Sequence, residues 1–125
     1  MSIERVIAGD TLILNSETGQ ELLRLRESTD GTAACAAVSG RLINEIVHDV
    51  EDELVALSLA SEKVIIDLNE AGYISNAMIR SFLELQHLMD AKNGELVLKG
   101  LSDDVFRVFE DMGVEDVFMI ERNGQ

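Results

Sequence analysis

Residues 64–83 read VIIDLNEAGYISNAMIRSFL, and this stretch decides the fold because strand, turn and helix patterns follow one another within it. The run Val64-Ile65-Ile66 is typical of a strand covered on both faces, which would sit centrally in its sheet. A turn is expected at 69–72. A helix should then begin at Ser75 or Asn76, since either residue can cap its first turn. A loop and an exposed helix start therefore lie at the carboxyl end of a central strand, where open sheets commonly bind ligands or partners.

The rest of the chain alternates strand and helix patterns. Strand candidates at 11–14 and 21–26 form a hairpin, and Asp30-Gly31 makes a tight turn into a strand at 32–39. Later elements follow in order: helix 44–60, strand 63–68, helix 76–91, strand 95–98, helix 102–112 and strand 117–120. This order predicts a single α/β domain over 1–125, with a mixed sheet, an N-terminal antiparallel hairpin and about three helices packed on the sheet.

Two further expectations concern the sheet. The first twenty residues exceed this core, and an edge strand, a dimer contact and a loosely held arm remain open alternatives for them. A charge at Ile65, in the unbroken apolar run, should destabilise the fold more than a charge at Leu25, in the alternating strand 21–26.

The motifs of residues 20–121 resemble those of STAS domains, the fold of bacterial anti-sigma-factor antagonists. In that family a strand ending in Asp-Leu is followed by an apolar pair and then by Asp-Ser-x-Gly-Leu at a helix start. Asp67-Leu68 and Tyr73-Ile74 match the first two features. The family's Asp, phosphorylatable Ser and Gly become Ser75, Asn76 and Met78, while Ile79 keeps the apolar place. Other similar segments are Val38-Ser39-Gly40-Arg41-Leu42, residues 93–98, and residues 102–114 with Phe109 and Gly113.

The resemblance implies a regulatory, non-enzymatic module whose protein partner is an anti-sigma factor or a kinase-like regulator. A structural or adaptor STAS module is the alternative, either as a homo-oligomeric assembly or as an accessory subunit of a transport ATPase. A nucleotide- or lipid-binding role is a third hypothesis. A homodimer is possible in each case.

The expected docking surface is the loop and helix start, which comprises Tyr73, Ile74, Ser75, Asn76, Ile79, Arg80 and Leu83. Ile79 and Leu83 lie on a helix face distinct from the stripe that contains Met78 and Phe82, although a wide buried stripe would place both in the core. Asn76 has no hydroxyl, so the family's phosphorylation switch is expected to be lost at its usual residue. Ser75 is the nearest substitute phosphoacceptor, and a capping or turn role competes with that function.

Charge and composition restrict the partner. Twenty-four acidic and ten basic residues give a formal charge of −14 without a basic cluster, which disfavours nucleic acid and anionic membranes and suits a basic protein. A hydrophobic content of 46% predicts a folded chain. No apolar stretch approaches the roughly 20 residues of a membrane span, so a cytoplasmic protein without membrane insertion is expected. Cys35, the only cysteine, fits a reducing compartment and is expected to be a core thiol.

Catalytic and metal-binding patterns are weak. The sequence has no Gly-rich phosphate loop, Gly-x-Ser-x-Gly elbow or His-Glu-x-x-His motif, so no enzyme activity, cofactor or metal is expected. Asp67 is better explained by hydrogen bonds to the adjoining turn than by acid catalysis. His48 and Asp52 could share an ion, and His87 lies near Asp90, but neither pair has a third ligand.

Overall fold

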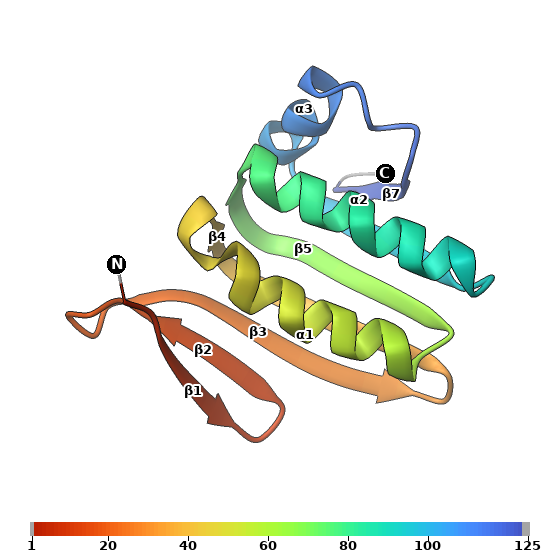
Figure 1. Cartoon of the computed structure of the whole chain (residues 1–125). Helices are drawn as coiled ribbons and strands as arrows, with labels where there is room; N and C mark the ends of the chain where they lie inside the picture. The colour runs from red at the N-terminus through yellow and green to blue at the C-terminus, as the bar shows by residue number, and fades with distance from the viewer. Residues whose placement is uncertain (1, 124–125) are drawn as a thin grey trace.

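The computed structural model describes residues 2–123, which form a seven-stranded sheet and three α-helices (Figure 1). The strands stand in sequence order, antiparallel from the first to the fourth and parallel from the fourth to the seventh. The elements are β1 (Glu4–Ala8), β2 (Thr11–Asn15), β3 (Glu21–Asp30), β4 (Ala33–Leu42), the 3₁₀ turn η1 (Asn44–Ile46), α1 (Val47–Ala60), β5 (Lys63–Ile74), α2 (Asn76–Ala91), β6 (Glu95–Leu101), α3 (Asp103–Asp111) and β7 (Met119–Arg122). The predicted mixed sheet with an antiparallel start and three helices is confirmed.

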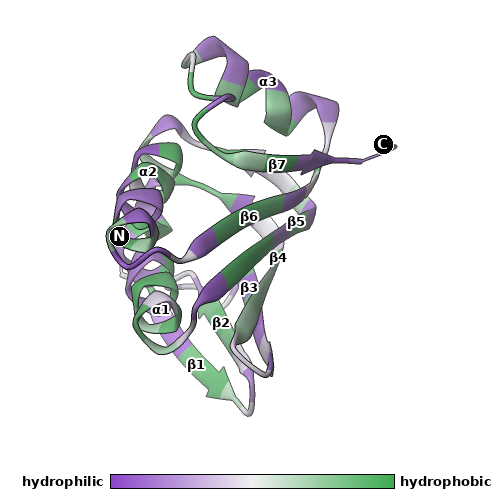
Figure 2. Ribbon diagram, turned by 90° about the vertical axis from the view of Figure 1, so that its right-hand side faces the viewer, coloured by the Kyte–Doolittle hydropathy of each residue, from purple (hydrophilic) through white to green (hydrophobic). Residues whose placement is uncertain are grey.

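The apolar core lies between the sheet and the helices. In Figure 2, α1 and α2 lie on the same side of the sheet, and the sheet residues that point toward them are buried. α3 contacts β5 and β6 and adds Phe109, whose ring meets Phe118 edge to face at 5.5 Å between centroids. The helix stripes predicted from the 3.6-residue period supply this core, including Val50 and Leu54 from α1 and Phe82 and Leu85 from α2.

One face of the sheet has no helix on it within residues 2–123, which corrects the prediction for the central strand. Burial alternates along β5, so that Val64 and Ile66 are fully buried whereas Ile65 is only half-buried. The β-branched run Val64-Ile65-Ile66 correctly predicts a strand, but such a run does not show whether helices cover one face of the strand or both. Leu25 is 0% exposed, so the expected order of the two charge substitutions is wrong: a charge at Leu25 should cost more than one at Ile65.

The predicted turn at 69–72 is also wrong, because β5 continues through it to Ile74. These residues pair with the end of β4, as in Glu70 with Ser39 and Ala71 with Gly40, after a shift of register. Gly40 has φ +126°, and a Cβ there would lie 2.8 Å from the carbonyl oxygen of Leu22. Position 40 therefore requires a glycine. Because β4 extends past this irregularity, residues 69–72 of β5 have a strand to pair with and do not form a turn.

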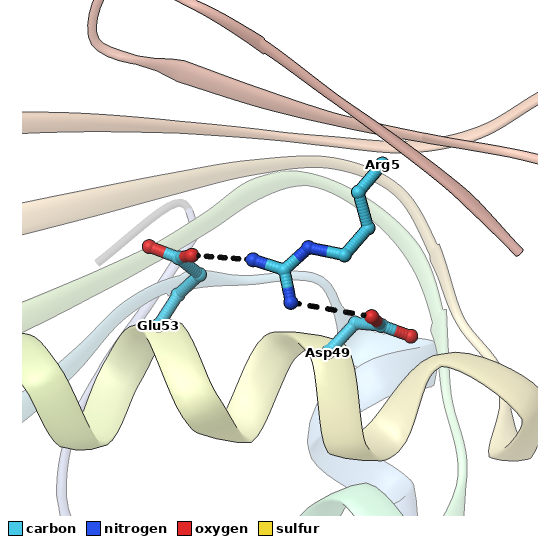
Figure 3. A network of polar contacts seen from close by, with 3 residues as sticks. All are labelled: Arg5, Asp49 and Glu53. Carbon is cyan, nitrogen blue, oxygen red and sulfur yellow. Dashed lines mark hydrogen bonds and ion pairs between the residues drawn. The ribbon is translucent and has the colours of Figure 1, made fainter.

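The N-terminal residues form the edge of the sheet. β1 pairs with β2 from Glu4 opposite Asn15 to Ala8 opposite Thr11, and all five residues of β1 are exposed. Arg5 reaches from this strand to α1, where its guanidinium lies 2.8 Å from Glu53 and 3.4 Å from Asp49 (Figure 3). The edge strand is thus tied to the helix layer by the two ion pairs of Arg5, since all five of its residues are exposed.

A third carboxyl group, that of Glu27, lies beside this network. Glu27 of β3 points toward α1, and burial together with the hydrogen bond and charge of Glu53 raises the pKa of Glu27 to about 7. Near neutral pH Glu27 therefore retains part of its proton, beside the carboxylate of Glu53.

Candidate partner-docking site

Ser75 is the residue that fixes the start of α2. Its Oγ accepts the backbone N–H of Met78 at 3.1 Å, and its own N–H donates to the carbonyl of Leu42 at 2.9 Å. The side chain is buried, with 4% exposure. Of the two capping candidates, Ser75 is therefore the cap, and its hydroxyl is held in the fold rather than presented to solvent.

Asn76 is the first residue of α2 and is exposed. It stands one residue beyond the cap, beside the free backbone N–H groups of the first helical turn. A side chain at this position can meet a partner without unfolding the helix. The position that corresponds to the family's phosphorylatable serine is therefore accessible, but here it carries an amide.

The structure separates the other predicted docking residues into accessible and buried sets. Tyr73 is 40% exposed, Arg80 is exposed and Leu83 is half-buried. Ile74 and Ile79 are 1% and 0% exposed and belong to the core. Neither isoleucine can touch a partner while the fold is intact, because α2 lies flat on the sheet and buries a wide stripe.

Arg41 is a site residue that the sequence predictions missed. It lies opposite Tyr73 in the parallel pairing of β4 and β5, and its guanidinium carbon is 4.8 Å from the centre of the tyrosine ring. The contact is a cation–π interaction that holds both side chains at the edge of the sheet. A signal was available, because the carboxyl ends of adjacent parallel strands meet at one edge.

The start of α2 is also joined to α1. The hydroxyl of Ser81 donates to a carboxylate oxygen of Glu51 at 2.5 Å. This bond joins the two helices nearly two turns beyond the cap. It supports the helix start as a fixed platform for the exposed side chains.

A hollow lies between the middle of β5 and the carboxyl ends of β6 and β7. It is an open cavity of about 520 Å³ whose walls include Asp67, Asn69, Lys99 and Glu121. Asp67 accepts the N–H of Asn69 at 3.0 Å and lies 4.0 Å from Lys99. The hydrogen bond to a neighbouring amide agrees with the structural role expected for Asp67.

The histidines considered as metal ligands do not come together in the fold. His48 and His87 are exposed on different helices. In the described part of the chain, no three His, Cys, Asp or Glu side chains are grouped so as to hold a metal ion. None of the helices in that part is long and apolar enough to span a membrane.

Comparison with known proteins identifies the fold family. A family model described as "Mlab, STAS domain" matches residues 25–121. The chain belongs to the STAS domain family. This confirms the resemblance drawn from the motifs around Asp67 and Ser75.

Individual relatives of this STAS protein are anti-sigma-factor antagonists. The anti-sigma-B factor antagonist of Listeria monocytogenes is 38% identical over 56 residues, which is 45% of this chain and 49% of the relative. The Listeria innocua protein matches equally well. The alignment thus spans about half the length of each relative.

Solved structures share the fold. A putative anti-sigma factor antagonist from Thermotoga maritima aligns with a TM-score of 0.72 at 12% identity, over 78% of this chain and 85% of that one. An antagonist from Mycobacterium paratuberculosis gives 0.72 at 11%, over 86% and 89%. SpoIIAA in its unphosphorylated form gives 0.68 at 15%, over 79% and 89%. At these identities the likeness concerns the fold alone.

Proposed function

We propose that this STAS protein is a non-enzymatic regulatory module that docks a protein partner through the α2-start surface. That surface consists of Arg41, Tyr73, Asn76, Arg80 and Leu83. The partner class that fits best is an anti-sigma factor or kinase-like regulator, because the named relatives are anti-sigma-B factor antagonists. The observation that carries the proposal is the exposed Asn76 at the start of α2, with the cap supplied separately by Ser75.

The chemistry of the surface supports docking. Tyrosine and arginine are the residue types most often found at the energetic centres of protein interfaces, since they combine apolar area with polar groups. Here Tyr73 is held by Arg41 at 4.8 Å, so little side-chain freedom is lost when a partner binds. Arg80 adds a second positive charge on an otherwise acidic chain, which would favour carboxylates at the matching part of the partner.

The proposal includes the loss of the phosphorylation switch. Phosphate at a helix start adds about −1.5 to −2 charges, which the free N–H groups and the helix dipole tolerate. Its effect would therefore fall on the docked partner rather than on the helix. Asn76 cannot accept phosphate, and Ser75 is buried with its oxygen engaged by Met78. Docking should then be constitutive or controlled elsewhere.

Calorimetric titration with a recombinant kinase-like anti-sigma factor from the same genome tests the docking surface. Tyr73→Ala and Arg80→Glu should each weaken binding by about tenfold or more, because each removes a central contact. Leu59→Ser is the matched control, since Leu59 is 76% exposed on α1, away from the surface. Unchanged binding of both surface variants would refute the docking surface.

Incubation of the same pair with ATP, followed by intact-mass analysis, tests the switch. The wild-type protein should gain no phosphate, whereas Asn76→Ser should gain one. Stoichiometric phosphate on wild-type Ser75 would contradict constitutive docking.

An adaptor role as an accessory subunit of a transport ATPase is the second candidate. It is favoured by the open edge at β1, where Ile7 is 70% exposed and the outer backbone groups can pair with another strand. Binding to the ATPase subunit of a transporter from the same genome, with no binding to the kinase-like protein, would select this role. Charge reversal at Arg80 would then have little effect.

A further inference from the structure

The sheet face opposite α1 and α2, here called the open face, carries an apolar row across four adjacent strands. Strand pairing aligns Cys35 with Ile65, Ile65 with Val97, and Val97 with Met119. Cys35 and Ile65 are half-buried, Val97 is 7% exposed and Met119 is 52% exposed. Cys35 is therefore not the core thiol expected from its apolar surroundings. A shallow hollow of about 160 Å³, lined in part by Ala33, Cys35 and Ile65, adjoins the row.

Charged residues flank this row on both sides, and their signs are opposite. Toward the carboxyl ends of the parallel strands, pairing aligns Arg26, Ala37, Asp67, Lys99 and Glu121. Toward the amino ends it aligns Asp30, Ala33, Lys63 and Glu95. On β3, β5 and β6, each positive residue on one side of the row is matched by a negative residue on the other side of the same strand.

This pattern is complementary to itself. A two-fold axis that runs along the apolar row would lay each strand over its own copy and exchange the two charged rows. Lys63 would then face Asp67 of the second copy, Glu95 would face Lys99, and Asp30 would face Arg26. Each contact occurs twice by symmetry. The apolar residues would meet their own copies along the axis.

The distribution of net charge also selects this face for self-association. The chain carries −14, so most contacts between two copies are repulsive. Residues 44–60, which form η1 and α1, contain five acidic residues and no Lys or Arg. The flanking positions of the open face instead combine four basic residues with five acidic ones: Arg24, Arg26, Lys63 and Lys99 with Asp30, Asp67, Glu70, Glu95 and Glu121.

We propose that the open face is the interface of a homodimer, in which two sheets pack face to face about the apolar row. Stacked sheets lie about 10 Å apart and cross at about 30°, which long charged side chains can span. The small side chains of Ala33, Cys35 and Ala37 on β4 leave room for close approach. The dimer goes beyond the proposed docking function and rests on other residues, and Asn76, Arg80 and Leu83 lie on α2, on the opposite side of the sheet from the open face.

The ion pairs already present on the open face are compatible with this exchange. Lys63 lies 3.7 Å from Glu95 and Lys99 lies 4.0 Å from Asp67, and all four side chains are partly exposed. Exposed pairs at such distances contribute little to stability. Their side chains can therefore turn toward a second copy at small cost, where exclusion of water strengthens the attraction.

Sedimentation equilibrium of the full chain tests the dimer. The wild-type protein should approach twice its 13.8 kDa mass as its concentration rises. Met119→Lys places a charge in the apolar row and should weaken dimerisation by about tenfold or more. Leu59→Lys, on the exposed side of α1, is the control and should leave the mass unchanged. A monomer at every concentration would overturn the proposal, as would a dimer that tolerates Met119→Lys.

A charge exchange tests the symmetry. Lys99→Glu should weaken the dimer because the introduced carboxylate would face Glu95 of the second copy, and the double variant Glu95→Lys with Lys99→Glu should restore it. Circular dichroism and thermal unfolding confirm that each variant is folded. A double variant no better than the single one would refute the two-fold arrangement. Cys35 lies on the axis, so a short bis-maleimide should join two wild-type chains, and failure to cross-link a sedimenting dimer would place its interface elsewhere.

Discussion

The two faces of the sheet differ in burial and in charge, although the same strands form both. On the covered face, side chains such as Ile66 and Leu25 belong to the apolar core and are fully buried. On the open face, their neighbours Ile65 and Arg26 meet other sheet residues and solvent. Charge follows the same division, because Lys63 and Lys99 pair within the open face whereas Glu27 and Arg5 engage the acidic side of α1. Apolar burial is therefore concentrated on one face, whereas the other stays partly exposed in the single chain.

The largest expected difference in the free energy of unfolding is between variants of two adjacent residues of β5, Ile65 and Ile66. Ile66→Asp should cost about 4 kcal/mol or more, because it leaves an unpaired charge in the core, and Leu25→Asp should cost a similar amount. Ile65→Asp should cost the monomer about 1 kcal/mol, since solvent reaches this position in a single chain. Urea unfolding of the three variants measures the difference. Equal losses for Ile65→Asp and Ile66→Asp at protein concentrations where the chain is monomeric would mean that another part of the same chain covers the open face.

The attachment of α2 to the covered face depends on its cap. Ser75→Ala should lower the free energy of unfolding by about 1 to 2 kcal/mol, because the N–H of Met78 loses its acceptor. Asn76→Ala should cost only a few tenths of a kcal/mol, since Asn76 is not the cap. Chemical unfolding of both variants compares them, and a larger loss for Asn76→Ala would reassign the cap.

Glu27, which lies beside Glu53, predicts that the stability of the fold depends on pH. The pKa of Glu27 is about 7 in the fold, above the value near 4.5 of a free glutamate, so the fold holds an extra proton between these values. Stability should therefore fall as pH rises from about 5 to 8, by an amount on the order of 1 kcal/mol after solvent screening. Glu27→Gln should remove most of this slope in thermal unfolding at several pH values. A slope that persists in Glu27→Gln would assign it to another group.

The smallest expected effects on stability are those of removing Arg5, which contacts α1, and Arg26, which pairs with Asp10. Arg5→Ala removes the bridge from β1 to α1 and should cost about 0.5 to 1 kcal/mol, with increased hydrogen exchange confined to β1. Arg26→Ala breaks only an exposed 3.4 Å pair with Asp10 and should change the stability of the monomer by about 0 to 0.5 kcal/mol. Equal and undetectable effects would show that the edge strand is held by its pairing with β2 alone.

Local pattern was sufficient where a residue's environment depends on its near neighbours in the chain. The 3.6-residue period located α1 and α2, Asp30-Gly31 located the turn between β3 and β4, and the motif around Asp67 and Ser75 pointed to the STAS family. Such signals survive because helix stripes and tight turns are fixed by backbone geometry over a few residues.

Tertiary structure decided what depends on a partner distant in sequence. Ile65 is half-exposed because both α1 and α2 lie on the other face, and residues 69–72 remain a strand because β4 extends beside them. Ile79 is core because α2 lies flat on the sheet. Arg41 reaches Tyr73 only through parallel pairing. For Ile65, Ile79 and Arg41 the sequence determined the type of element, whereas packing determined which side chains meet solvent. For residues 69–72 the neighbouring strand determined the type of element itself.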